Sequence, residues 1–248
     1  MRFDVITLFP AMIEGPLSDS ILMRAREAGK IEVAVHNLRD WAEGKHRCCD
    51  DAPFGGGDGM VMKPGPLFRA VRAVKALAPS SRTVLLTPQG RRLDSGLVVE
   101  LSRRPGLILV CGHYAGVDER VRELAIDDEV SIGDYVLSGG EPAAVVVMDA
   151  VARQLPGVLG NEVSAQDESF PGRLEYPQYT RPAEFEGLRA PEVLLSGHHQ
   201  QVERWRKRER LRRTWLRRPD LLAAYPPDAE EKEWIEELRA ELEARGRD

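Results

Sequence analysis

The sequence has no long apolar run, and only three of its 248 residues are cysteine. No stretch reaches the roughly 20 apolar residues of a membrane-spanning helix, and the opening MRFDVITLFPAM lacks the basic segment and apolar stretch of a secretory signal. Cys48 and Cys49 are neighbours, which disfavours a disulfide framework and fits a reducing compartment. We therefore expect a cytoplasmic protein with no membrane partner.

Metal-ligand patterns, internal repeats and low-complexity tracts are also missing from the sequence. His46, Cys48 and Cys49 lie close together, but their spacing matches no standard zinc pattern, and we interpret them as ordinary loop or core residues. The lack of repeats disfavours a solenoid. With 42% hydrophobic residues, the chain can bury the core of one large domain and leave room for a small one.

Charge is unevenly distributed along the chain, although the formal net charge is only -5. Residues 203–218, ERWRKRERLRRTWLRR, hold nine Lys or Arg and two Glu, whereas residues 228–248 are mainly acidic. The basic segment is a candidate for contact with nucleic-acid phosphates. Its arginines could instead pair with the acidic helix that follows, because runs of charge usually lie on solvated surface.

Apolar runs rich in branched side chains alternate with helical patterns over the first 155 residues. This alternation predicts an α/β fold with a mostly parallel sheet covered by helices. A helix over 143–155, AAVVVMDAVARQL, is apolar enough to be buried against the sheet or against a second subunit. The other expected elements are strands at 3–8, 31–35, 83–86 and 107–110, and helices at 18–28, 67–77 and 94–103.

Residues 156–173 have little periodicity and several glycines and prolines, so we expect a domain boundary there. His198 and His199, which precede the first of the expected C-terminal helices, either cap that helix or contact a nucleic acid. The predicted organisation is an α/β domain at 1–160, a linker at 161–175 and a small all-helical domain at 176–248, with helices at 200–217, 219–224 and 229–245.

Glycine-rich segments follow the expected strands. Residues 87–90, 111–116 and 131–140 all lie at strand carboxyl ends, the edge at which parallel sheets bind ligands. Glycines let a ligand approach backbone N–H and C=O groups, which can read the edge of a base, so these loops predict a pocket for an adenosine-like ligand. Residues 54–60, FGGGDGM, fit neither a P-loop nor a dinucleotide fingerprint, and form either a flexible turn or a substrate-contacting loop.

Several motifs in fixed order carry a family resemblance. They are LLTPQGRRLD, LILVCGHYAGVDERV, SIGDYVLSGGEPA, PGVLGNE, QYTRP, VLLSGHH and RTWLRRP. With these motifs the chain resembles the bacterial tRNA (guanine-N1)-methyltransferases, knotted transferases of the SPOUT class that methylate the guanosine 3′ of the anticodon during tRNA processing. The similarity runs from LFP near the N-terminus to Pro219 and so covers nearly all of the chain.

The resemblance implies a fold, a cofactor and partners. It implies a deep trefoil knot in the α/β domain, an exception to the usual absence of knots. S-adenosyl-L-methionine would be the methyl donor and tRNA the substrate, and magnesium is left open as a further cofactor. A homodimer with active sites at its interface would suit the apolar helix 143–155. By matching position, the cofactor pocket would comprise Leu86, Thr87, Pro88, Gly112, Tyr114, Gly116, Ile132, Gly133, Asp134, Tyr135, Val136, Leu137, Gly139 and Gly140.

Guanine N1 holds a proton near neutral pH, so methylation at N1 needs a base to remove this proton and a cation to stabilise the charge that develops on O6. The resemblance matches these roles to Arg153 and the pair Asp167 and Glu168. Taken alone, Arg153 would be a cation at a helix C-terminus, and the carboxylates would be solvated loop charges. The family usually has aspartate before Ser-Phe, where this chain has Glu168; we expect Glu168 to be the base, with Asp167 as the substitute.

Ala115 is a second departure from the family pattern, because a glutamate often occupies the matching position. A role of that glutamate cannot be carried over, and substrate contacts near Gly116 stay open. We interpret His113 as a packed or hydrogen-bonded residue. The expected tRNA phosphate contacts, which give salt-dependent affinity, are Arg204, Arg206, Lys207, Arg212 and Arg213.

Two other functions stay open on the sequence alone. A related knotted methyltransferase could act on another RNA position, such as a ribose hydroxyl. The departures at Glu168 and Ala115 would also fit a non-catalytic RNA-binding protein that retains an adenosine pocket. The methylated product separates these functions.

Overall fold

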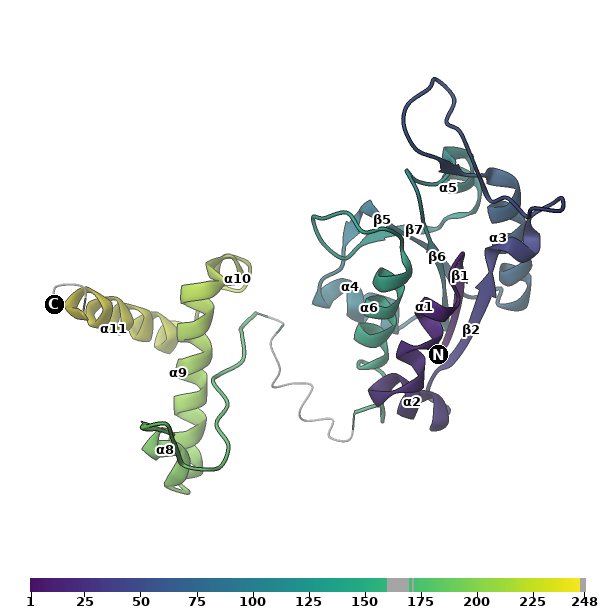
Figure 1. The fold of residues 1–248 in the computed structure, drawn as a ribbon. Helices are drawn as coiled ribbons and strands as arrows, with labels where there is room; N and C mark the ends of the chain where they lie inside the picture. The colour runs from purple at the N-terminus through teal and green to yellow at the C-terminus, as the bar shows by residue number, and fades with distance from the viewer. Residues whose placement is uncertain (160–169, 171, 246–248) are drawn as a thin grey trace. The chain divides into compact units, whose positions relative to one another are not determined.

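The computed structural model describes residues 1–159, 170 and 172–245, and the chain divides into two compact units, Met1–Ala165 and Gln166–Asp248 (Figure 1). Each unit is described by itself. Residues 160–169 and 171, which include most of the expected linker 161–175, lie outside the described residues. None of the described helices is both long enough and apolar enough to cross a membrane.

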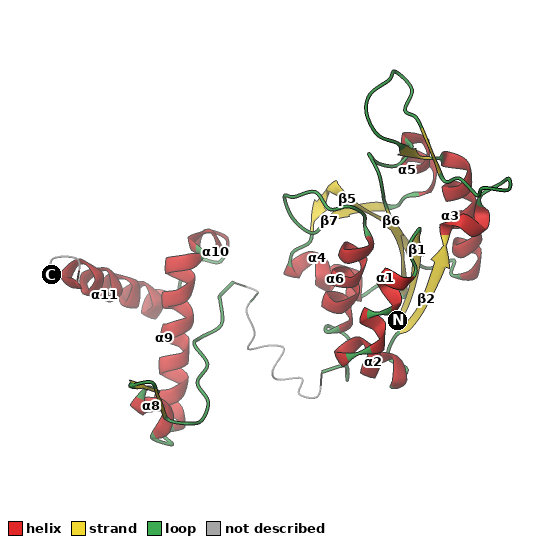
Figure 2. Ribbon diagram, viewed as in Figure 1, coloured by secondary structure: helices red, strands yellow, loops and turns green. Residues whose placement is uncertain are grey.

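The first unit is built on a five-stranded sheet in which all neighbouring strands are parallel (Figure 2). This arrangement confirms the predicted α/β fold. A separate antiparallel hairpin joins β3 (Asp50–Asp51) to β4 (Val61–Met62). In the order β2–β1–β6–β5–β7, the sheet strands are Glu32–Asn37, Arg2–Thr7, Gly106–Cys111, Arg82–Arg92 and Asp128–Ser131.

Helices cover both faces of the sheet. On one face lie α1 (Ala11–Glu14), α2 (Ser20–Glu27), α4 (Ser95–Ser102) and α6 (Glu141–Ala152); on the other lie α3 (Pro64–Leu77) and α5 (Glu119–Ala125) (Figure 1). Short 3-10 turns, η1 (Pro16–Ser18) and η2 (Leu38–Trp41), complete the unit.

The central strand β6, GLILVC, shows why both faces need helices. It is buried at every position. Because side chains alternate along a strand, Leu107 and Leu109 enter one core, while Ile108 and Val110 enter the other. The continuous apolar run that predicted this strand therefore reflects burial on both faces.

Strand β5 continues farther than predicted, to Arg92 instead of Leu86. Its pairing with β7 shifts register between Leu86 and Arg91, which both lie opposite Val130. Pro88 lies inside this bulge and, lacking an N–H, cannot donate a ladder hydrogen bond. Residues 87–90 therefore bulge at the carboxyl edge of the sheet before pairing resumes.

The predicted ends of two helices can be compared with their capping groups. Helix α4 begins as predicted, because the carboxylate of Asp94 accepts a hydrogen bond from the Leu97 N–H at 2.8 Å. Helix α6 starts two residues earlier than predicted, at Glu141, and ends at Ala152 with Arg153 as its C-cap residue. Strand β7 and helix α5 were not predicted, because both are short and partly polar.

A buried carboxylate ties β1 to β2. Asp4 is fully buried, accepts hydrogen bonds from Arg2 Nε at 2.7 Å and Arg2 Nη2 at 2.9 Å, and lies 2.8 Å from His36 Nε2. Burial alone would raise the pKa of Asp4, but the hydrogen bonds from His36 and Arg2 outweigh it and hold this pKa below its ordinary value. The ionised carboxylate is therefore part of the folded state.

The second unit contains α8 (Glu192–Leu195), α9 (His199–Arg217), α10 (Pro219–Ala224) and α11 (Ala229–Arg245), around a small core of Leu211, Trp234 and Ile235. The prediction of an all-helical unit is wrong in one respect, because β8 (Glu184–Phe185) and β9 (Leu188–Arg189) form a hairpin. Its two turn residues, Glu186 and Gly187, have φ of 52° and 76°, the backbone that a two-residue turn requires.

Arg173 and Leu174, near the start of the second unit, pack against its helices. Arg173 donates to both carboxylate oxygens of Glu231 on α11, at 3.2 and 2.7 Å. The Leu174 N–H donates to Thr214 Oγ on α9 at 2.8 Å. The chain from residue 172 onward is thus attached to the helical unit.

Candidate functional site

A cavity of about 470 Å³ opens at the carboxyl edge of the sheet in the first unit. Pockets of roughly 300 to 1,000 Å³ suit small-molecule ligands. Three walls come from the bulge of β5, the loop after β6 and the loop after β7. They contribute residues 85–89, 112–117, 130–133 and 135–140, and Arg122 and Ala143 complete the lining.

The structure brings together 13 of the 14 residues predicted for the cofactor pocket. The exception is Asp134, which is exposed and does not line the cavity. The other 13 residues all line it: Leu86, Thr87, Pro88, Gly112, Tyr114, Gly116, Ile132, Gly133, Tyr135, Val136, Leu137, Gly139 and Gly140.

Arg122 also lines the cavity, and the sequence did not predict it there. It lies on α5, which was not predicted, and its guanidinium donates to Glu129 at 3.1 and 2.5 Å and to Gln89 Oε1 at 2.9 Å. These contacts join α5 to β7 and to the bulge of β5. No motif marks Arg122, and only the folded pairing of these elements brings it to the cavity.

Gly140 is required because two walls of the cavity approach each other there. Its N–H donates to Gly112 O at 2.8 Å. A Cβ on Gly140 would lie 2.7 Å from the Cα of Cys111 and 3.0 Å from the N of Gly112. Since its φ is -78°, close packing and not an unusual backbone conformation excludes a side chain.

Tyr114 stands at the rim with a left-handed backbone, φ 61°, and a half-exposed ring. Its ring packs edge-on against His113 at 4.9 Å, and His113 contacts Phe9 at 5.0 Å. Burial and the charge of Asp50 raise the pKa of Tyr114, against an opposing effect of Arg39. Its hydroxyl therefore stays protonated near neutral pH.

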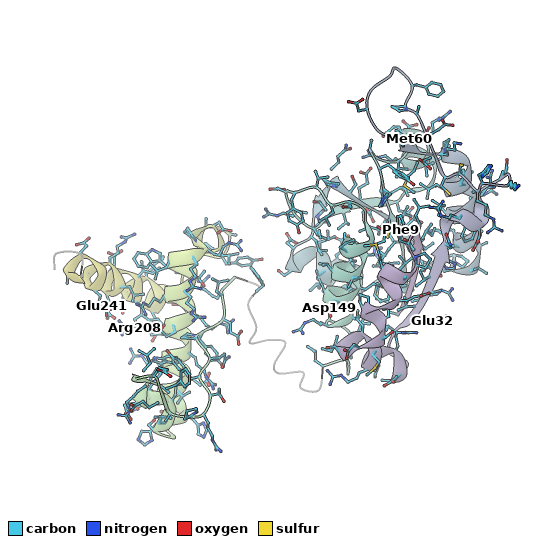
Figure 3. All side chains as sticks on the ribbon, viewed as in Figure 1. Phe9, Glu32, Met60, Asp149, Arg208 and Glu241 are labelled. Carbon is cyan, nitrogen blue, oxygen red and sulfur yellow. The ribbon has the colours of Figure 1, made fainter. Side chains whose placement is uncertain are left out.

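The glycine-rich loop 54–60 is fixed at one end beside the cavity. Ala115 N–H donates to Met60 O, and Met62 N–H donates to Gly116 O, both at 2.9 Å. Met60 is labelled in Figure 3 at the foot of this loop. At the other end of the loop, Phe54 is 98% exposed. The loop thus adjoins the cavity rim, which fits the substrate-contacting alternative, and Ala115 serves as its attachment point.

Of the predicted catalytic residues, the described one, Arg153, does not line the cavity. Arg153 is half-buried at the end of α6, whose first residue, Glu141, follows the cavity-lining Gly140. Twelve helical residues at 1.5 Å each separate the two ends by about 18 Å. Asp167 and Glu168 lie outside the described residues.

Most of the cations predicted to contact tRNA are engaged in ion pairs on the helical unit. Those pairs are Lys207 with Asp228 at 3.2 Å and Glu230 at 3.0 Å, Arg204 with Glu230 at 3.7 Å, Arg206 with Glu203 at 2.6 Å, and Arg212 with Glu209 at 3.6 Å. Arg213 has no ion pair with another described residue. Exposed pairs contribute about 0–1 kcal/mol each, so phosphates can compete for these cations.

Aromatic side chains accompany the basic segment. Trp205 lies 6.4 Å from both Tyr176 and Tyr179, and the guanidinium of Arg206 lies 5.0 Å from the Tyr176 ring. His198 occupies the N-cap position of α9, but its side chain makes no capping hydrogen bond. Over the part of the chain that the structure describes, no three His, Cys, Asp or Glu side chains form a group that could hold a metal ion.

The chain is similar to known proteins over most of its length. The family model described as "tRNA (Guanine-1)-methyltransferase TrmD" matches residues 1–224. Three similar proteins are named tRNA (guanine-N(1)-)-methyltransferase. They come from Chloroflexus aggregans (59% identity over 224 residues, 90% of this chain and 88% of that protein), Geobacter sp. strain M21 (58% over 223, 90% of each) and Geobacillus kaustophilus (52% over 244, 98% and 100%).

Proposed function

The chain belongs to the tRNA (guanine-N1)-methyltransferase family, and from this membership we propose that it transfers a methyl group from S-adenosylmethionine to N1 of the guanosine 3′ of the anticodon, in the cytoplasm. As a member of this family, the chain methylates N1 of guanine in tRNA. The main support for S-adenosylmethionine as the donor is the cavity, because the loops that match the family by sequence form its walls.

The cavity fits the methyl donor. Its walls present backbone at Gly112, Gly139 and Gly140, where no side chain keeps a ligand from the main chain, while the Gly140 N–H and the Gly112 C=O bond to each other. Apolar residues such as Leu86 and Ile132 offer surface for an adenine ring. When bound, S-adenosylmethionine supplies a methyl group activated by its sulfonium. The 13 predicted residues in the lining would hold it.

The remaining chemistry falls to acidic and basic side chains. Glu168, with Asp167 as the substitute, would remove the proton from guanine N1, and Arg153 would stabilise the negative charge that develops on O6. Single-turnover methyl transfer tests these roles. Glu168→Gln and Arg153→Ala should each slow transfer at least a hundredfold at saturating donor and tRNA. Full activity in both variants would refute the assignment but not the activity.

We also propose a homodimer with active sites at its interface. Arg153 lies ten residues, or about 15 Å, along α6 from the cavity-lining Ala143, farther than an arginine side chain reaches. A second copy can bring its own Arg153 to that cavity. Apolar side chains exposed at the cavity rim and along α1 and α6 (Phe9, Met12, Val136, Leu137 and Val146) provide surface for such a partner.

Mixed dimers test the shared site. Arg153→Ala and Gly140→Val should each be inactive alone, because one lacks the cation and the other forces the two walls of the cavity apart. If sites form across the interface, mixing the unfolded chains and refolding them should restore activity at about one site in each mixed dimer. Recovery would be absent if each chain supplied its own Arg153.

The helical unit is proposed to contact the tRNA backbone through Arg204, Arg206, Lys207, Arg212 and Arg213, with a linker that ends before Arg173, which already packs on α11. Arg213→Ala should weaken tRNA binding and lower the salt-dependence slope by about 1. A matched exposed variant, Arg239→Ala on α11, should change neither.

Two finer features of the proposal have direct tests. A magnesium requirement would show as activity lost with EDTA and regained with Mg²⁺. A trefoil knot in the α/β domain would show, when the chain is stretched from its ends, as a contour length shorter than 248 residues allow.

A further inference from the structure

A buried acidic side chain beside the cavity has no part in the proposed reaction. Glu141, the first residue of α6, is 1% exposed. Thr7 Oγ donates to its Oε1 at 2.7 Å, while its Oε2 has no hydrogen-bond partner among the described residues. The Thr7 hydroxyl accepts from the Phe9 N–H at 2.8 Å, so its single proton is directed to Glu141.

Burial of the Glu141 carboxylate has a desolvation cost that nearby charges or hydrogen bonds must offset. The N-terminus of α6 favours negative charge at this position, but a buried carboxylate with one hydrogen bond still carries a desolvation cost. The charge of Glu141 is felt by its neighbour Cys111. The pKa of that thiol is raised well above its ordinary value, first by burial and then by Glu141. A further cation or donor close to Oε2 would lower the cost.

His113 is in place to be that donor. Its Nδ1 lies 3.9 Å from Glu141 Oε2, and both atoms are buried without a hydrogen-bond partner among the described residues. The imidazole is packed between the rings of Phe9 and Tyr114 and lines the cavity. A movement of about 1 Å would bring the two atoms within hydrogen-bond distance.

The two side chains belong to different walls of the cavity. His113 follows β6, whereas Glu141 ends the loop that follows β7. Gly139 lies between them, since a Cβ on it would overlap both His113 Nδ1 and Glu141 Oε2. The backbones of His113 and Gly139 also form an isolated antiparallel bridge. Thr7, at the end of β1, anchors the arrangement to the sheet.

We propose that Glu141 and His113 form a positioning pair, supported by Thr7, that fixes the distance between two walls of the methyl-donor pocket. This inference rests on the proposed function, because it takes S-adenosylmethionine as the ligand. The pair acts through the main chain of residues 112–113 and 139–140 and removes no proton from guanine. Its loss therefore lowers donor affinity and leaves tRNA affinity unchanged.

Glu141→Gln tests the charge, because glutamine keeps the shape of the side chain and can still accept from Thr7. A hydrogen bond to a charged group is strong enough to predict an affinity for S-adenosylmethionine lowered about tenfold or more, measured by calorimetry on the full-length protein. The KM for the donor should rise by the same factor, with kcat and the KM for tRNA changed less than twofold. Asp149→Asn, on the exposed side of the same helix (Figure 3), is the matched control and should behave as wild type.

Coupling separates a pair from two independent structural residues. His113→Asn should weaken donor binding in the wild-type background and have little further effect in Glu141→Gln. At Thr7, valine should weaken donor binding, whereas serine, which keeps the hydroxyl, should restore it. Additive effects of the His113 and Glu141 variants, or equal effects of valine and serine, would overturn the pair.

These experiments also distinguish a failure of the positioning pair from a failure of the proposed function. A wild-type protein that does not bind S-adenosylmethionine would refute the proposed donor. A wild-type protein that binds it, with Glu141→Gln binding equally well, would refute the positioning pair alone. If Glu141→Gln does not fold, as judged by its melting curve, the His113 and Thr7 variants decide; wild-type donor affinity in both His113→Asn and Thr7→Val would then overturn the inference.

Discussion

Adding one methyl group at Gly140 should open the two walls of the cavity. In Gly140→Ala the new Cβ would start 2.7 Å from the Cα of Cys111 and 3.2 Å from its carbonyl carbon. Carbon atoms pack at about 3.5–4.0 Å, so the walls must separate by about 1 Å. The atoms met are backbone atoms of the central strand, which cannot rotate away as the end of a flexible side chain would.

The displacement sets the expected size of two effects. Overpacking of this kind costs about 1–3 kcal/mol of folding free energy, which lowers Tm by roughly 2–12 °C for a chain of this size. A shift of about 1 Å in a binding wall can reduce function by up to about a hundredfold. Because a stability loss of this size leaves nearly all of the protein folded, we expect the fall in donor affinity to come from the displaced wall itself.

Differential scanning calorimetry and titration with S-adenosylmethionine check both effects. Gly15→Ala is the matched control, because Gly15 has helical φ and ψ of -55° and -59°, and its Cβ would lie 3.7 Å from the nearest atom, Ala11 O. It should leave donor affinity unchanged and stability equal or higher by about 0.4–1 kcal/mol. A Gly140→Ala protein with wild-type Tm and donor affinity would refute the close approach of the two walls.

Three further variants test other parts of the structure. The pKa of Asp4 is depressed in the folded protein, so ionisation of Asp4 stabilises the fold above about pH 4, its ordinary pKa. This contribution to stability is lost as pH falls through the folded-state pKa. The free energy of urea unfolding from pH 3 to 7 should therefore depend less on pH in Asp4→Asn than in wild type. Cys48 is exposed, whereas burial raises the pKa of Cys111, so a thiol reagent should label Cys48 first. The fast phase of labelling should be absent in Cys48→Ser. Phe54→Ala should raise the KM for tRNA about fivefold or more, if the exposed ring stacks on a base, and leave donor affinity unchanged; an unchanged KM for tRNA would favour the flexible-turn alternative.

Local signals were sufficient to predict much of the α/β unit. Strand β6 was predicted because it is apolar on both faces, and the start of α4 because Asp94 is a capping residue. Strand β7 and helix α5 escaped prediction, since their positions depend on pairing with β5 and on the ion pair between Arg122 and Glu129. The continuation of β5 past Pro88 has the same cause, because proline signals a break and only the neighbouring strand restores pairing.

The functional site, like the fold, was predicted from the sequence only in part. Glycines mark the cavity walls in the sequence, and 13 of 14 predicted residues line the cavity. The sequence did not show why Gly139 and Gly140 must be glycine, because the crowding atoms belong to Cys111, Gly112, His113 and Glu141. His113 was interpreted as a packed residue; it does pack against Phe9 and Tyr114, but it also lines the cavity.

The nucleoside produced by the protein tests the central claim most directly. Unmodified tRNA would be incubated with the wild-type protein and S-adenosylmethionine, digested to nucleosides, and mapped by mass spectrometry of the parent fragments. We predict one methyl group per tRNA, as 1-methylguanosine at the position 3′ of the anticodon. A methyl group on ribose or on another nucleotide, or donor binding with no transfer to any tRNA, would contradict the account.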